Sequence, residues 1–175
     1  DFIRKHKLYY AFRVYNKKRT VRFDFIARRE AAAFETAKGL LDDLFVPGDY
    51  VFPIFYGCDV PGSHGRWRWN RDMGRYFRLG SVKRMSKREY YLTGDKDYDE
   101  NNPYFVLGQT RYENINMDKY LRDLFRQEHD MLFTLLNLKK SAAINFYDGG
   151  CDVFAYDVDL LNRIAEAHKE YLIEM

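Results

Sequence analysis

The sequence predicts an α+β fold over residues 1–175, in which an antiparallel or mixed sheet ends in a three-strand meander and helices pack mainly on one face. Two observations predict it. Segments rich in aromatic and β-branched residues alternate along the chain with segments whose apolar residues have helical spacing. The last third holds three strand-like runs separated only by short turns. With 46 % apolar and 18 % aromatic residues, the chain can also build a packed core.

The N-terminal third is expected to fold as strand, helix, strand. Aromatic residues dominate the strand expected at residues 8–16. From Arg28 onward the apolar residues have the spacing of a helix, and Pro47 ends this pattern, so a helix is expected between the two. The next strand is expected at residues 49–57. Because Pro53 has no backbone N–H to donate, this strand should lie at a sheet edge or contain a bulge.

Residues 58–100 form an insert without a clear structural signature, which is first basic and aromatic and then acidic. The part up to residue 79 is expected to be a short helix or an irregular arm, and a strand should follow at residues 87–92. The acidic stretch at residues 95–103 is typical of a solvated turn. It lacks a glutamate at the spacing that a calcium loop needs for its bidentate ligand.

The last part of the chain has the clearest signals. A strand over residues 103–113 precedes a helix whose N-cap is Asn116. The three strands of the meander are expected at residues 132–138, 142–148 and 151–156. Asp157 should then cap the final helix. The apolar face of that helix is expected to consist of Leu161, Ile164, His168, Tyr171 and Leu172.

Two adjacent glycines predict a structural turn between the last two strands. Gly149 and Gly150 can adopt the positive φ of a two-residue hairpin turn, and Asp148 can accept hydrogen bonds from the turn amides. Strand alternation places Asp152 on the face opposite its two neighbours. A metal or acid–base cluster formed by these two aspartates and Asp157 is the alternative. Alternation spreads the three carboxylates apart, so the sequence favours the structural turn.

Residues 66–78 are the predicted partner-binding surface, because five arginines lie there among four aromatic residues. Arg and Trp dominate binding hot spots, since they combine a large contact area with directed polar groups. The segment either contacts an acidic protein, or binds a nucleic-acid strand by stacking and phosphate contacts, or sends its aromatic residues into the core while its arginines stay in water. The predicted anchors for a protein partner are Arg66, Trp67, Arg68, Trp69, Arg71 and Arg75.

No catalytic or cofactor-binding motif is recognised. The four histidines lack metal-ligand spacing, and the sequence contains no nucleophile elbow, Walker loop or dinucleotide-binding motif. His64 lies near Ser63 and Cys58, but nothing is identified that would orient its ring for nucleophilic catalysis. His168 is expected in the core or at its boundary. The sequence therefore predicts a non-enzyme that holds neither a cofactor nor a metal.

The net charge of +3 hides an uneven distribution. Residues 1–94 carry 20 basic and 10 acidic side chains, whereas residues 95–175 carry 9 and 16. Two electrostatically different faces are expected if these halves are separate in space.

The cysteine content and the hydropathy indicate a cytoplasmic protein that does not associate with a membrane. Cys58 and Cys151 are isolated in the sequence, which favours buried thiols in a reducing compartment, with a disulfide as the alternative. No apolar run is long enough to span a membrane.

Two stretches carry a resemblance to a known family. The first reads YDGGCDVFAYDVDLLNRIAEAHKEYL: an aromatic residue and Asp, a turn, then a small residue, Asp, Val, an apolar residue and Ala. The second, FRVYNKKRTVRFDFIARREAAAFETAKGLLDDLFVPGDYVFPIFY, has an arginine-bearing strand, a helix ending in Leu-Phe and a strand after an acid. Both resemble the bacterial domain of unknown function 3885 family. Gly149 replaces an arginine that is common in that family's turn.

The resemblance supplies no reaction, but it implies a kind of role. Some members resemble, by their setting, immunity or partner-binding proteins encoded near secreted toxins. We therefore expect a non-enzymatic bacterial protein-binding domain, which as an immunity protein would neutralise a toxin by covering its active surface. Nucleic-acid binding through the basic N-terminal half is the alternative.

Overall fold

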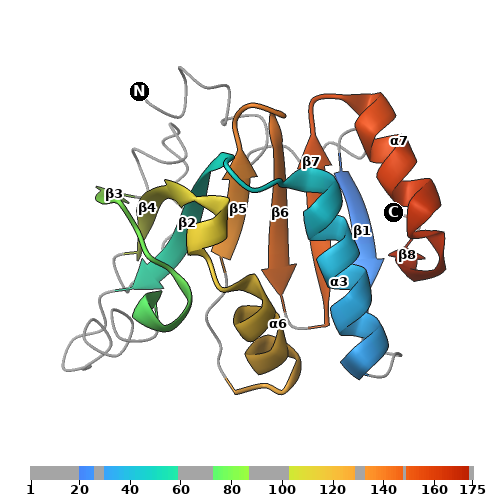
Figure 1. Cartoon of the computed structure of the whole chain (residues 1–175), viewed down its shortest axis with the longest axis horizontal. Coiled ribbons are helices and arrows are strands. Elements are labelled where there is room, and N and C mark those ends of the chain that lie inside the picture. The colour runs from blue at the N-terminus through green and yellow to red at the C-terminus, as the bar shows by residue number, and fades with distance from the viewer. Residues whose placement is uncertain are drawn as a thin grey trace.

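The computed structural model describes residues 20–25, 30–58, 73–86, 103–128, 133–147 and 149–173. Its strands are β1 (Thr20–Asp24), β2 (Tyr50–Cys58), β3 (Ser81–Ser86), β4 (Pro103–Arg111), β5 (Phe133–Asn137), β6 (Ala142–Tyr147), β7 (Gly150–Ala155) and β8 (Leu172–Ile173). Its helices are α3 (Glu30–Leu44), α6 (Met117–Phe125) and α7 (Val158–Ala167), with 3₁₀ turns at Tyr112–Asn114 and Lys169–Tyr171. This is the predicted α+β fold, and the three helices cover the same face of one sheet (Figure 1).

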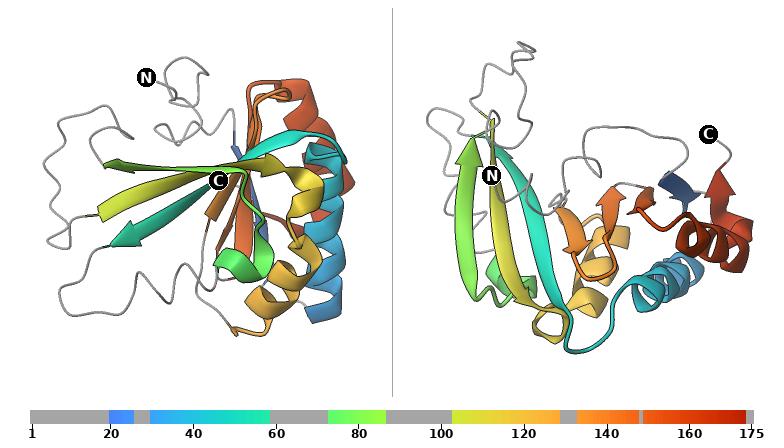
Figure 2. Two further views of the ribbon diagram at one scale, coloured as in Figure 1. Left: turned by 60° about the vertical axis from the view of Figure 1, so that its left-hand side comes forward. Right: turned by 90° about the horizontal axis from the view of Figure 1, so that it is seen from above.

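The eight strands of this sheet follow the order β3-β4-β2-β5-β6-β7-β1-β8. Each pairing between described strands is antiparallel. Strands β5, β6 and β7 are consecutive neighbours, so the predicted meander is confirmed. The sheet is strongly curved, and β3, β4 and β2 turn away from the other strands (Figure 2).

Strand β1 was not expected from the sequence, and the strand expected at residues 8–16 lies outside the described residues. β1 pairs with β7 on one side and with β8 on the other. Its side chains alternate as a strand requires: Phe23 is fully buried in the core, whereas Arg22 lies on the opposite face of the sheet. β1 thereby ties the N-terminal part of the chain to the C-terminal meander.

Pro53 lies in an interior strand, so the expectation of a sheet edge or a bulge was wrong. β2 has β4 on one side and β5 on the other. The register with β4 is the same before and after Pro53, which shows that no extra residue is inserted. The register of β2 with β4 aligns Gly108 with Pro53, and a Cβ on Gly108 would be 3.1 Å from the proline Cγ and 2.9 Å from Leu79 Cδ2. The glycine therefore makes room for the proline ring inside the sheet.

Both predicted helix caps are confirmed. The side chain of Asn116 accepts a hydrogen bond from the backbone N–H of Lys119 at 3.1 Å. The carboxylate of Asp157 accepts hydrogen bonds from the backbone N–H groups of Asp159 and Leu160 at 2.9 and 3.2 Å. Each cap satisfies amides that have no partner within the helix.

The final helix is shorter than its apolar pattern suggested. Leu161 and Ile164 are buried, but α7 ends at Ala167 and His168 is its C-cap. Leu172, which was expected on the same helical face, lies instead in β8 and is exposed. The chain thus leaves the helix to add an edge strand next to β1.

The inserted segment contributes a strand that the sequence did not reveal. Residues 73–76 are helical, in agreement with the expected short helix. β3 follows at Ser81–Ser86, ahead of the strand expected at residues 87–92, which lie outside the described residues. The core between helices and sheet is strongly aromatic, and its largest fully buried side chains include Tyr76, Tyr120, Phe23, Phe45, Phe55 and Phe146.

Candidate functional site

The predicted partner anchors lie in the segment that leads into β3. Arg66, Trp67, Arg68, Trp69 and Arg71 are outside the described residues, and Arg75 is the anchor that the structure describes. Arg75 and Arg78 are exposed, whereas Tyr76 and Phe77 between them are only 2 % and 4 % exposed. In the described part of this segment, the aromatic residues therefore enter the core and the arginines remain in water, as one of the three interpretations predicted.

A buried hydrogen-bond network holds this segment against α6. The hydroxyl of Tyr76 donates to Asp123 Oδ2 at 2.7 Å, and Lys119 Nζ donates to the same oxygen at 2.8 Å. Burial of Asp123 raises the pKa of its carboxyl. The two hydrogen bonds, together with the charges of Lys119 and Arg75, outweigh this effect and hold the pKa below its ordinary value. The network therefore anchors the backbone directly after Arg75, at Tyr76.

Strand β3 forms one end of the described sheet. It pairs with β4, and no other described strand pairs with its outer edge. Val82 near its start is 57 % exposed. Residues 73–86, which we call the basic margin, contain four basic residues and no acidic one. Within the described residues, this end of the sheet combines a strand edge that has no described neighbour with the exposed Arg75 and Arg78.

The opposite end of the molecule is acidic. Helix α3 carries four acidic residues and one basic residue, and it lies beside α7 (Figure 1). The two halves of the chain are not spatially separate in the described residues, because β1 and α3 pack with β7, β6 and α7. The charge asymmetry is therefore not a division between chain halves. It is a contrast between the basic margin and the helices at the other end.

The turn between β6 and β7 lies one residue earlier in the chain than predicted. Gly150 already pairs with Tyr147 and begins β7, so two residues, 148 and 149, separate the paired strands. Gly149 has the expected positive φ of 87°. Gly150 is required for a different reason, since a Cβ there would collide with the carbonyl oxygen of Phe23 on β1. Asp148 lies outside the described residues.

Asp152 belongs to a line of polar side chains across the sheet, on the face that no described helix covers. Thr134 of β5 is opposite Asn145 of β6, Asn145 is opposite Asp152 of β7, and Asp152 is opposite Arg22 of β1. We call these four residues the polar row. The Thr134 hydroxyl donates to Asn145 Oδ1 at 3.3 Å. The predicted orientation of Asp152, opposite to its neighbours, is confirmed.

Arg22 and Asp152 form the strongest interaction of the polar row. Arg22 Nε donates to Asp152 Oδ1 at 2.7 Å and Nη2 donates to Oδ2 at 2.9 Å. The side chain of Asp152 is 5 % exposed and that of Arg22 is 29 % exposed. Tyr147 adds a third hydrogen bond to Oδ1 at 3.2 Å, and the guanidinium lies 5.7 Å from its ring centroid. Burial and the Asp152 carboxylate both raise the pKa of the Tyr147 hydroxyl, which therefore stays a donor.

The chemistry of this arrangement favours a structural clamp over a catalytic or metal site. Arg22 and Tyr147 occupy the carboxylate of Asp152, while Asp157 is used as a helix cap. No cluster of three or more His, Cys, Asp or Glu side chains suited to a metal ion occurs among the described residues. Burial raises the pKa of the Cys151 thiol, which makes it a poor nucleophile.

His168 lies at the core boundary, as predicted. Its Nε2 is 3.0 Å from Asp43 Oδ2 of α3, and its ring packs over Gly39, where a Cβ would be 2.9 Å from Cε1. The ring also meets Phe23 edge-on. His168 thus joins α7 to α3, whereas the other three histidines lie outside the described residues.

Comparison with known proteins assigns the family. The sequence model of the family described as Domain of unknown function (DUF3885) matches residues 1–175. The chain belongs to this family. No curated protein and no solved structure matches it. The two stretches that resembled the family supply β1 and β7, which are neighbours in the sheet and are joined by Arg22 and Asp152. The description of the family names no reaction, and no described helix has the length and apolar character needed to cross a membrane.

The sequence did not reveal the role of Arg22. The residue is 130 positions from Asp152, and no local pattern links the two. One signal was present, since both lie in the stretches that carry the family resemblance. An arginine in one such strand and a buried aspartate in another are candidates for an ion pair once the strands are known to be neighbours.

Proposed function

We propose that this chain is a non-enzymatic protein-binding domain whose basic margin holds an acidic surface of a partner protein. One observation carries the proposal: the exposed Arg75 and Arg78 lie next to the outermost strand of the described sheet. Arginine forms paired hydrogen bonds with carboxylates and contributes strongly to interfaces. An exposed strand edge can add main-chain hydrogen bonds to such a contact.

The rigidity of the basic margin supports this role. Tyr76 and Phe77 are anchored in the core, and Phe77 Cα pairs with Ile115 in an isolated β-bridge. The backbone N–H of Arg78 donates to Asn114 at 3.1 Å. Arginines on a fixed backbone lose less conformational freedom when a partner binds, so more of the interaction energy appears as affinity.

The finer form of the proposal is an immunity-type protein in the bacterial cytoplasm, which neutralises a toxin by covering its active surface. Its support is the resemblance to family members encoded near secreted toxins. Occlusion needs only a complementary surface, which suits a chain without a recognised catalytic motif.

The test is binding to the protein encoded by the adjacent gene, measured by calorimetry with the full chain. We expect the variant Arg75→Glu with Arg78→Glu, and the variant Trp67→Ala with Trp69→Ala, each to weaken binding about 30-fold or more, which corresponds to about 2 kcal/mol. Lys169→Glu is the matched control, because Lys169 is an exposed basic residue in the 3₁₀ turn directly before β8, the strand at the opposite end of the sheet from β3. Unchanged affinity in both double variants would overturn the assignment of the surface.

Nucleic-acid binding is the second candidate, because residues 66–88 carry nine basic side chains and one acidic side chain. Its signature is distinct. The affinity for a single-stranded oligonucleotide should fall steeply with salt, with a logarithmic slope of about −0.7 for each phosphate contacted. A tight protein complex that changes little with salt favours the first proposal.

A further inference from the structure

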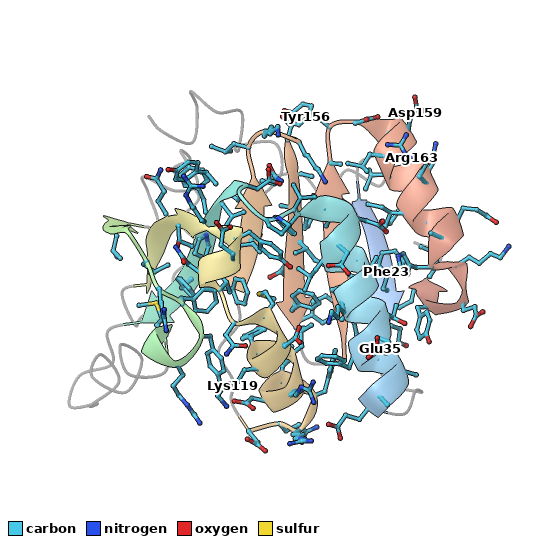
Figure 3. All side chains as sticks on the ribbon, in the orientation of Figure 1. Phe23, Glu35, Lys119, Tyr156, Asp159 and Arg163 are labelled. Carbon is cyan, nitrogen blue, oxygen red and sulfur yellow. The ribbon has the colours of Figure 1, made fainter. Side chains whose placement is uncertain are left out.

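A second candidate site lies away from the basic margin, where α7 approaches the turn between β5 and β6. A cleft of about 610 Å³ opens there. Its lining residues are Asp43, Lys139, Lys140, Asp157, Leu160, Arg163, Ile164 and Ala167. The volume is within the range of small-molecule sites. Arg163 and the neighbouring start of α7 can be followed in Figure 3.

The cleft gathers positive charge in an acidic part of the chain. Residues 95–175 carry only nine basic side chains, and three of these, Lys139, Lys140 and Arg163, line this cleft. Arg163 is exposed and has no ion-pair partner among the described residues. Lys139 is also exposed, and its nearest ion-pair oxygen in the described structure, on Asp49, is 3.9 Å away. Both cations therefore have hydrogen-bond donors left for a ligand.

The two acidic residues of the cleft are already engaged by the protein. Asp157 accepts the two backbone N–H groups at the start of α7. Asp43 has its carboxylate 3.0 Å from the ring nitrogen of His168, and its backbone carbonyl accepts a hydrogen bond from Lys140 Nζ at 2.9 Å. These carboxylates hold the walls together, and neither is close enough to Arg163 or Lys139 to form an ion pair with it.

The elements that carry the cations are fixed in place. The buried side chain of Asn137 accepts hydrogen bonds from the backbone N–H groups of Lys139 and Lys140 at 3.1 and 3.2 Å. Its amide donates to the carbonyl of Leu44 at 3.0 Å and to Asp49 at 2.8 Å. The turn between β5 and β6 is therefore tied to the end of α3, so the lysine backbone is positioned before any ligand arrives.

The apolar residues of the cleft all come from α7. Leu160, Ile164 and Ala167 lie on the same face of this helix as Arg163, because they are three or four positions apart from it or from one another. Ile164 is almost completely buried, so a ligand that reaches the cations would meet apolar surface at Leu160 and Ala167. We propose that this cleft binds a small oxyanion, a carboxylate or a phosphate monoester, that carries a short apolar chain. Arg163, Lys139 and Lys140 would hold the oxyanion and the α7 wall would hold the chain.

The test uses the full chain and follows backbone amide resonances by NMR during titration with hexanoate, hexyl phosphate, acetate, inorganic phosphate and hexanol. We expect saturable shifts for residues 139–141 and 157–164 with hexanoate or hexyl phosphate. Acetate, inorganic phosphate and neutral hexanol should each bind at least 10-fold more weakly, since each lacks one of the two groups that the cleft recognises. The tighter of the two chain-bearing probes identifies the oxyanion.

Variants assign the site. Arg163→Gln, and separately Lys139→Gln with Lys140→Gln, should each weaken binding at least 5-fold while the spectrum elsewhere stays unchanged. Arg126→Gln is the control, because it removes the same charge from an exposed arginine whose partner is Glu30, outside the cleft. The proposal is overturned if no probe saturates below about 10 mM, if hexanol binds as well as hexanoate, or if Arg126→Gln has the same effect as Arg163→Gln.

Discussion

The Arg22–Asp152 pair provides the sharpest test of how this fold is closed. The pair joins β1 to β7 through two short hydrogen bonds, and Asp152 is buried. If these contacts act as a clamp, removal of both partners should cost much less than the sum of the two single removals. The perturbation is a double-mutant cycle with Arg22→Met, Asp152→Leu and the combined variant, which replaces the charges by apolar side chains of similar size.

The expected magnitudes follow from the burial. Loss of one partner of a buried ion pair costs about 3–5 kcal/mol. Because Arg22 is partly exposed, we expect the lower end for Arg22→Met, about 3 kcal/mol, and about 2 kcal/mol for Asp152→Leu, where water can reach the remaining guanidinium. The combined variant should also lose about 2 kcal/mol, since Tyr147 loses its acceptor. The coupling energy is then about 3 kcal/mol.

The assay is urea unfolding followed by far-UV circular dichroism, with the free energy of unfolding taken from linear extrapolation. Thermal midpoints should fall by about 6–12 °C for Arg22→Met. The exposed pair Lys169–Glu166 supplies a matched control cycle, for which the coupling should stay below about 0.5 kcal/mol. A coupling for Arg22 and Asp152 as small as that of the control would refute the clamp.

Three further predictions concern single sites. Gly150→Ala should lower the free energy of unfolding by about 2 kcal/mol, measured by urea unfolding, because its Cβ would displace the backbone of Phe23. Asp123→Asn should lower it by about 2 kcal/mol at pH 7. In the folded protein, the pKa of the Asp123 carboxyl is held below its ordinary value of 3.8. The ionised carboxylate therefore stabilises the fold above pH 3.8, and this stabilisation is lost as the pH falls through the native pKa. A difference in unfolding free energy between wild type and Asp123→Asn that stays constant down to about pH 2 would contradict this. Cys151 is fully buried and its pKa is raised, so in a Cys58→Ser variant it should not react with a thiol reagent at pH 8 until urea unfolds the chain. Rapid reaction of the native protein would count against the burial of Cys151.

Features that depend on neighbouring residues in the chain could be predicted from the sequence. The caps Asn116 and Asp157 follow from a side chain that reaches amides two or three positions away. The meander follows from alternation and short turns. Pro53 was misplaced because its setting depends on Gly108 of another strand, which removes the side chain that would block the ring. No rule about proline alone contains that information.

The candidate site was less accessible to sequence reasoning, because it depends on which distant segments become neighbours. The pairing of Arg22 with Asp152 needs the order of β1 and β7 in the sheet. In the basic aromatic segment, the burial of Tyr76 depends on the carboxylate of Asp123 on α6, 47 positions away. The cleft beside α7 likewise brings Lys139 together with Arg163 only after the meander and α7 have folded back on α3.

The dependence of the basic margin on Asp123 also determines how binding data should be interpreted. The carboxylate of Asp123 accepts a hydrogen bond from the Tyr76 hydroxyl, and the charge of Arg75 lowers the pKa of the Asp123 carboxyl. Arg75 and Asp123 therefore influence one another. A substitution of Arg75 that weakens a partner complex could act through this network as well as through a lost contact. The contact explanation requires that Asp123→Asn, which disturbs the network but leaves the exposed arginines in place, weaken the complex much less than Arg75→Glu. If both variants weaken it equally, the position of the backbone rather than the guanidinium determines affinity, and the partner surface must be sought elsewhere on the sheet.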